Sequence, residues 1–241
     1  MVLTCVGRSV EGRPIEAYVS RRRGPCALLV LAGMHGDEPK SVSLARRLLE
    51  LVAAHEEQVR PLPVRHVIVP LVNPDGFRRR SRRNARKVDL NRNFPTSNWE
   101  PGQRRHRMFG GESPASEPET LAIVGLVERL APRRIISVHS ISRERHCNNY
   151  DGPGLAMARR MQRFNGYPVR ASIGYPTPGS FGTWAGRERG IRTITLELPS
   201  HHSNARCWED NRDALLCWLT APARRARRPA QPHVECFAPR R

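Results

Sequence analysis

Four short apolar runs alternate with segments of helical periodicity, and this alternation restricts the fold of the chain more than any other feature. Runs of five to nine residues lie at Cys26–Ala32, Val64–Val72, Arg134–Val138 and Thr193–Leu198. Apolar runs of about this length are typical of buried strands, and helices between such strands give an α/β fold. We therefore predict a mixed central sheet flanked by helices on both faces.

The helices of this fold are expected between the strands and after the last one. The patterns predict them over Pro39–Leu51, from Ser116 onward, around Leu155–Phe164, and after the last strand, where Trp208, Leu215 and Leu219 share one face. For the second of these helices, Ser116 and Glu119 are predicted to form a capping box, with Pro118 in the first turn.

We expect one catalytic domain over residues 1–220 and a basic, mobile tail over residues 221–241. The periodic patterns stop at about Ala221, and the remaining residues contain six arginines, four prolines and a single acid. A segment with so much charge and so few apolar residues cannot bury enough surface to offset the entropy of ordering it.

The composition excludes some classes of protein. The hydrophobic content of 39% is enough for a core, and 41 Lys and Arg against 22 Asp and Glu give a net charge of +19. This charge is spread along the chain and is not interleaved with stacking aromatics, as binding to single strands would require. We therefore do not expect nucleic acid to be the partner.

The sequence favours a cytoplasmic protein without a membrane segment. The first residues have no basic region followed by an apolar one, and the longest apolar run, Cys26–Met34, is half of what a membrane crossing needs. Six cysteines are scattered without a CxxC pair or a dense framework, which is typical of reduced thiols.

Polar side chains follow the predicted strands at the points where the strands end. His35 and Glu38 come after the first strand, Asn73 after the second and His139 after the third, while Glu197 lies at the end of the fourth. In open α/β sheets, ligands bind outside the carboxyl ends of the strands. These side chains are therefore candidates for one common site.

His35 and Glu38 have the spacing of half a zinc site, because two side chains three residues apart at a helix start can reach one ion. A third ligand would complete a set of two histidines and one glutamate and leave one position for water, and His139 is the natural candidate. For any single histidine, a hydrogen-bonded core position is the more common alternative.

Five further segments occur in one order along the chain and carry a resemblance. They are NPDGF at 73–77, RRNARKVDLNRNFP at 82–95, SVHS at 137–140, GSFGTW at 179–184 and TLELP at 195–199. With these segments the sequence resembles the zinc carboxypeptidase family over roughly residues 7–219. The resemblance implies a zinc carboxypeptidase-like fold and the activity of a zinc metallopeptidase or amidase.

The resemblance also implies which residues hold the metal. It makes His35, Glu38 and His139 the ligands of one Zn²⁺ per chain. It makes Asp89 the carboxylate that orients a ligand histidine, a contact that fixes the ring of such ligands.

The remaining residues of the family pattern bind and transform the substrate. The resemblance implies that Glu197 is the catalytic base and that Arg82 polarises the scissile carbonyl. It assigns Asn91 and Arg92 to the terminal carboxylate of the substrate, which suits the planar fork of an arginine. Tyr175 matches a mobile tyrosine that covers the substrate, although its spacing to Gly179 differs by one residue from the family pattern.

The segments HGDEP, EPET and GYPTPGSFGTW are most similar to bacterial members of the family that act on murein peptides. They imply hydrolysis of the γ-D-glutamyl–meso-diaminopimelate bond during cell-wall recycling, with a murein tripeptide or related small anionic peptide as partner. The alternatives are a zinc carboxypeptidase or an N-acyl amino acid deacylase of other specificity. A basic nucleic-acid-binding protein on an inactive peptidase scaffold is the alternative of another class.

Two segments are candidates for the substrate pocket. The run from Arg78 to Lys87 has seven cations and no acid, so it forms either a solvated loop or an electropositive rim for a substrate with several carboxylates. CNNYDGPG at 147–154 follows His139 and is a candidate pocket wall, with Asn149 or Asp151 facing the ammonium group of diaminopimelate.

Overall fold

The computed structural model describes residues 1–58, 65–142 and 144–219. The tail predicted over residues 221–241 therefore lies outside the described residues. The longer helices are α1 (Pro39–Gln58), α2 (Pro74–Arg79), α3 (Pro118–Leu130), α4 (Leu155–Asn165) and α5 (Asn204–Leu219). Short helical turns lie at η1 (Leu90–Arg92), η2 (Gly152–Gly154) and η3 (Gly182–Arg187).

Within these residues, eight strands form one sheet in the order β1-β2-β4-β3-β5-β8-β6-β7. In chain order they are β1 (Val2–Arg8), β2 (Pro14–Val19), β3 (Cys26–Ala32), β4 (Arg65–Val69), β5 (Arg134–Ile141), β6 (Cys147–Asp151), β7 (Val169–Arg170) and β8 (Arg192–Pro199). The central strands β4, β3, β5 and β8 are parallel, whereas β2 and β6 join them as antiparallel neighbours. The predicted mixed sheet is thus confirmed.

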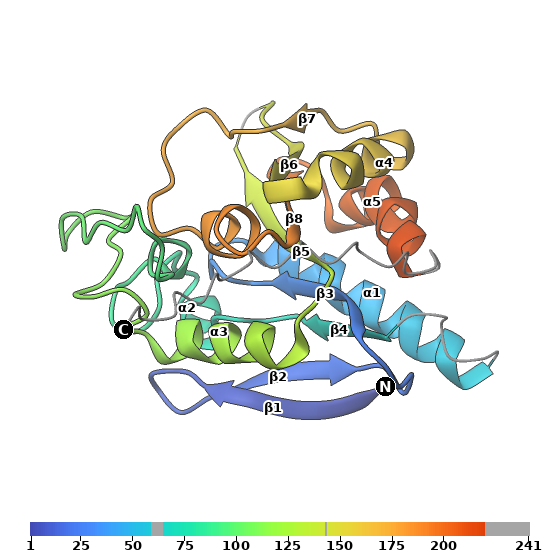
Figure 1. Cartoon of the computed structure of the whole chain (residues 1–241), viewed down its shortest axis with the longest axis horizontal. Coiled ribbons are helices and arrows are strands. Elements are labelled where there is room, and N and C mark those ends of the chain that lie inside the picture. Colours follow the sequence, from blue (N-terminus) through green and yellow to red (C-terminus); the bar gives the residue numbers. More distant parts are fainter. Residues whose placement is uncertain (59–64, 143, 220–241) are drawn as a thin grey trace, which may run out of the picture.

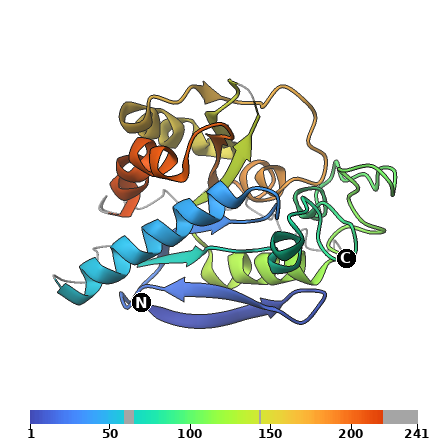
Figure 2. The ribbon, with the colours of Figure 1, turned by 180° about the vertical axis from the view of Figure 1, so that it is seen from behind.

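Helices cover both faces of this sheet, as predicted (Figures 1 and 2). Alternate side chains of β3 point to opposite faces, as strand geometry requires. Leu28 and Val30 belong to the core under α1, α4 and α5. Leu29 and Leu31 belong to the core on the other face, which α3 and η3 cover.

The predicted strands and helices are present, with shifted ends. The predicted strand Val64–Val72 is described from Arg65 and ends at Val69, because Pro70 has no backbone N–H to continue the ladder. The helix predicted over Pro39–Leu51 extends to Gln58. Within the described residues, no helix combines the length and the hydropathy that a membrane crossing requires.

The predicted capping box at the start of α3 is wrong. The N-cap residue is Glu117, and its side chain makes no capping hydrogen bond. Ser116 Oγ donates instead to Glu117 Oε1, and the Glu119 carboxylate accepts hydrogen bonds from Val10 N and Asn84 Nδ2. Partners distant in sequence thus replace the local capping contact.

The hairpin of β1 and β2 and the strands β6 and β7 are not among the predicted strands. The residues of β1 are mostly exposed, with Val2 and Leu3 each 54% accessible, so no continuous apolar run marks them. β7 has only two residues. Their pairing depends on contacts with strands that are distant in sequence.

Candidate active site

The site lies where β3, β5 and β8 end, beside a cavity of about 1210 Å³. These three strands are parallel neighbours, so their carboxyl ends meet at one edge of the sheet. His139 on β5 lies directly opposite Glu197 on β8 in the ladder register. The sheet therefore brings together side chains that are 58 residues apart in the chain.

The turn between β3 and α1 positions His35 and Glu38. An added Cβ at Gly36 would overlap the backbone of Gly76 in α2, so only glycine fits between the two segments. Asn73 caps α2 by accepting from Gly76 N and donates to Met34 O. Asn73 therefore supports the turn, and its side chain is used in these local contacts.

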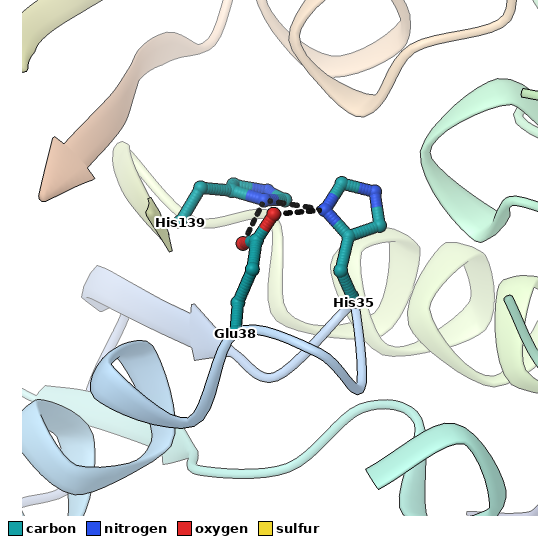
Figure 3. A group of neighbouring side chains, drawn as sticks. All are labelled: His35, Glu38 and His139. Atoms are coloured by element: carbon teal, nitrogen blue, oxygen red, sulfur yellow. Dashed lines mark hydrogen bonds and ion pairs between the residues drawn. The ribbon is translucent and has the colours of Figure 1, made fainter. Parts of the chain in front are cut away.

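The side chains of His35, Glu38 and His139 point toward one another from β5 and from the turn after β3 (Figure 3). His35 Nδ1 lies 2.7 Å from Glu38 Oε1, and His139 Nδ1 lies 3.1 Å from Glu38 Oε2. The two Nδ1 atoms are 3.2 Å apart. All three residues are buried.

This arrangement fits a metal ion. Two ligand atoms bound tetrahedrally to zinc at about 2.0–2.1 Å from the ion lie roughly 3.3 Å apart, close to the separation of the two Nδ1 atoms. The far ring nitrogens are held by other groups, because His35 Nε2 contacts Asp89 Oδ1 at 3.0 Å and His139 Nε2 contacts Ser137 Oγ at 3.2 Å. The three side chains could therefore hold one metal ion and leave a fourth position free.

Asp89 joins His35 to Arg82. Its Oδ1 lies 3.0 Å from His35 Nε2 and also accepts from Asn91 N, while its Oδ2 accepts from Arg82 Nε at 2.8 Å. Arg82 Nη1 lies 3.6 Å from Glu38 Oε1. The carboxylate thus fixes both the histidine ring and the guanidinium.

The charged side chains around the candidate metal site shift one another's pKa values. Burial opposes ionisation of Glu38 and Asp89, but the neighbouring His35 and the cations around them outweigh it and hold both pKa values well below the usual range. Burial and Arg82 oppose protonation of His35, yet Glu38 and Asp89 raise its pKa. Burial lowers the pKa of His139 despite Glu38.

Glu197 differs from the other carboxylates because it has no cation in direct contact among the described residues. Burial, reinforced by the charge on Glu38, raises the pKa of Glu197 to about 8. The residue lines the cavity together with His35, Glu38 and His139. A carboxyl group whose pKa lies near neutrality is suited to accept and return a proton.

Asn91, Arg92 and Tyr175 line the same cavity. Asn91 Oδ1 accepts from Phe181 N at 2.9 Å. Arg92 is 3% exposed and donates to neutral groups, Asn91 O and Met108 Sδ, with the Tyr175 hydroxyl also beside it. Burial lowers the Arg92 pKa. A buried guanidinium without a directly bonded carboxylate can take an anionic ligand.

Of the two alternatives for the run Arg78–Lys87, a solvated loop or an electropositive rim, the rim is present only at Arg82. Arg79 instead pairs with Glu11, and Arg86 lies 3.9 Å from Glu117. The other cations of the cavity come from elsewhere in the chain, at Arg92, Arg107, Arg145 and Arg187. Sequence reasoning missed Arg107, Arg145 and Arg187, because only the folded chain brings these segments to the cavity.

Strand β6 forms one wall of the cavity, which confirms the prediction for the segment 147–154. Asn149 and Asp151 both line it, and they lie opposite Thr195 and Thr193 of β8. Asp151 Oδ1 accepts from Arg187 Nε at 2.9 Å. Cys147 lies opposite Glu197, and burial raises the pKa of its thiol to about 12, so it is no nucleophile.

Known proteins share both the sequence and the fold. The family model described as zinc carboxypeptidase matches residues 1–150. Murein peptide amidase A of Escherichia coli K12 is 36% identical over 80% of this chain and 79% of its own length, and that of Vibrio campbellii is 33% identical over 81% and 79%.

Solved structures extend the comparison. The murein-tripeptide amidase of Escherichia coli O157 superposes with a TM-score of 0.75 at 30% identity, covering 93% of this chain and 94% of that one. Bovine thrombin-activatable fibrinolysis inhibitor has the same TM-score at 20% identity, covering 91% and 88%, and shares the fold. The chain therefore belongs to the zinc carboxypeptidase family of metal-dependent hydrolases.

Proposed function

We propose that this chain is a zinc-dependent amidase that hydrolyses the γ-D-glutamyl–meso-diaminopimelate bond of murein peptides in the cytoplasm, during cell-wall recycling. The observation that carries the proposal is the convergence of His35, Glu38 and His139 beside Glu197 in one cavity. Similarity to murein peptide amidases across about four fifths of the chain supports the substrate class.

His35, Glu38 and His139 would hold the zinc ion, with Asp89 fixing the ring of His35. When bound there, zinc supplies Lewis-acid activation of water and of the scissile carbonyl. Because the charges around them hold Glu38 and Asp89 in the ionised form, the site supplies the negative charge that a metal cation needs.

Glu197 is the base and then the acid of the proposed reaction. Its carboxylate accepts a proton from the attacking water and later donates that proton to the leaving amine nitrogen. The return of the proton is favourable because the leaving amine is more basic than the carboxylate of Glu197.

Arg82, Asn91 and Arg92 position the peptide. Arg82, held by Asp89, donates to the carbonyl oxygen on which negative charge develops. Arg92 binds the carboxylate of the terminal residue next to the scissile bond, with Asn91 beside it. Tyr175, beside Arg92 and 36% exposed, covers the bound residue.

The test is mass spectrometry of L-Ala-γ-D-Glu-meso-diaminopimelate incubated with the purified protein. We expect release of free diaminopimelate, loss of the reaction with a chelator and recovery with added zinc. A protein that binds one zinc ion and leaves the peptide intact would contradict the substrate, and a panel of ordinary peptides and acyl amino acids would then separate a carboxypeptidase from a deacylase.

A further inference from the structure

The cavity has a second polar cluster at the end of β6, away from the metal ligands. It consists of Asn149 and Asp151 on β6 and Arg187 at the end of η3, and all three residues line the cavity. None of them contacts His35, Glu38 or His139 through a hydrogen bond or an ion pair in the described part of the chain. The proposed chemistry leaves this cluster without a role.

Asp151 is buried and only partly satisfied. Its Oδ1 accepts from Arg187 Nε, but no hydrogen bond within the described residues reaches Oδ2. Oδ2 lies against Gly182, where an added Cβ would overlap it, so the absence of a side chain at Gly182 leaves space for this carboxylate. Burial raises the Asp151 pKa against the effect of Arg187. A positive group beside Oδ2 would complete the site.

Asn149 provides a second unsatisfied acceptor. The residue is 8% exposed, and its Oδ1 is buried and has no hydrogen-bond partner among the residues that the structure describes. Buried polar atoms nearly always have a partner, so this oxygen in the cavity wall is a candidate acceptor for a donor in the cavity. Asn149 and Asp151 are two residues apart on one strand, so their side chains lie on the same face.

Arg187 provides donors next to these acceptors. Its guanidinium uses Nε for Asp151 and Nη2 for Ala171 O at 3.4 Å, and its side chain is 57% exposed. Among the described residues, no hydrogen bond or ion pair uses Nη1. The cluster therefore offers two oxygen acceptors for a cation and one cationic donor for an anion, side by side.

We propose that Asn149, Asp151 and Arg187 form a subsite for an amino acid end group, in which an ammonium and a carboxylate are attached to the same carbon. The ammonium donates to Asp151 Oδ2 and Asn149 Oδ1, and the carboxylate accepts from Arg187. This inference rests on the proposed function, since the side chain of diaminopimelate ends in such a group, and it assigns the residues that select it over lysine.

The strand register gives a length that agrees with this substrate. Asp151 is four residues along β6 from Cys147, which lies opposite Glu197, so the two positions are about 13 Å apart at roughly 3.3 Å per residue. The five bonds from the scissile nitrogen to the distal carbon of diaminopimelate span about 6 Å, since three backbone bonds of an extended chain span about 3.6 Å. The side chains of Glu197 and Asp151, with their hydrogen bonds of about 3 Å to the substrate, span the remaining distance.

The test compares three tripeptides that differ only in the distal end of the last residue. L-Ala-γ-D-Glu is followed by meso-diaminopimelate, by lysine, which lacks the distal carboxylate, or by 2-aminopimelate, which lacks the distal ammonium. We would measure kcat/KM for the zinc-loaded wild type, Asp151→Asn and Arg187→Gln, with Arg163→Gln as an exposed control outside this cavity.

We expect a crossed pattern. Asp151→Asn lowers kcat/KM about 10- to 100-fold for the two peptides with a distal ammonium, the size of one charged hydrogen bond, and does not lower it for 2-aminopimelate. Arg187→Gln lowers it for the two peptides with a distal carboxylate and does not lower it for lysine. Asn149→Leu follows the pattern of Asp151→Asn, and Arg163→Gln changes none of the rates.

Equal losses on all three peptides would show that Asp151 or Arg187 only supports the fold, and unchanged rates would also overturn the inference. Calorimetric binding of free diaminopimelate and 2-aminopimelate separates this inference from the proposed function. One outcome is that no peptide is cut, that the wild type binds diaminopimelate more tightly than 2-aminopimelate, and that Asp151→Asn binds both equally. The proposed function then fails and the subsite stands. Equal binding of both compounds by wild type would contradict the subsite.

Discussion

The two ends of the cavity are built in different ways. At the metal end, His35, Glu38 and His139 follow or end parallel strands of the central sheet, and their charges are balanced by direct contacts with one another and with Asp89 and Arg82. At the other end, Asn149 and Asp151 lie on an antiparallel strand, and no hydrogen bond within the described residues reaches Asn149 Oδ1 or Asp151 Oδ2.

This difference separates chemistry from selection. At the metal end the charged side chains contact one another, so this end presents the same groups to any amide. The distal end is incomplete without a ligand, so it distinguishes one terminal residue from another. Changes at the metal end should therefore alter the rate for every substrate, whereas changes at the distal end should alter the preference among them.

The largest loss is expected for Glu197→Gln. Glutamine keeps the shape of the side chain and cannot accept the proton, so kcat should fall about 10³-fold while the zinc content stays at one per chain. Stopped assays of product, together with metal analysis, check both parts, with Glu209→Gln as the exposed control. A Glu197→Gln variant that retains the wild-type kcat would remove this residue from the mechanism.

The next effect is expected at Arg82. Arg82→Gln removes a donor to the developing oxyanion, so kcat should fall about 10²- to 10³-fold with a smaller change in KM. Arg82→Lys should recover part of the loss because it keeps the charge. Arg78→Gln, in the same basic run and outside the cavity, should match the wild type. A change in KM alone would assign Arg82 to ground-state binding.

A smaller effect is expected for Asp89→Asn, which weakens the hold on His35 and Arg82. We expect zinc affinity to fall about 10- to 100-fold, measured by competition with a chelator. The exposed Asp213→Asn variant serves as control. An unchanged affinity would show that Asp89 acts on Arg82 alone.

The last effect, on stability and not on activity, is a dependence on pH in the metal-free protein. Because the Glu197 pKa is raised to about 8, the folded state holds a proton that the unfolded state has lost above about pH 4.5. This contribution to stability is full below that pH and is lost as the pH rises through about 8. The free energy of unfolding of the wild type, measured in urea relative to that of Glu197→Gln, should fall by at most about 1.4 kcal/mol per pH unit over this window.

Added zinc should remove most of this slope, because a dication beside Glu197 favours its ionised form. A wild type whose stability follows that of Glu197→Gln at every pH would contradict the raised pKa.

The sequence predicted the metal end more completely than the distal end. The four strands that build the centre of the sheet are buried apolar runs, and the polar residues at their ends are visible in the sequence. The predicted residues His35, Glu38, His139 and Glu197 lie together for this reason, although their chemical roles stay predictions.

The distal end of the cavity depends on contacts between segments that are distant in the sequence. Arg187 follows GSFGTW by three residues and looks like any other arginine of a chain rich in them. Its place beside Asp151 is set by the close approach of η2 and η3, where a Cβ on Gly152 would overlap Gly186 O. No local pattern in the sequence encodes that contact.

The most direct test is a crystal structure of Glu197→Gln loaded with zinc and the intact diaminopimelate tripeptide. We expect one metal ion between His35 Nδ1, Glu38 and His139 Nδ1, and the distal ammonium and carboxylate of the peptide at Asp151 and Arg187. A peptide whose distal end points out of the cavity, or a metal ion bound elsewhere, would contradict the division of the cavity into a chemical and a selecting end.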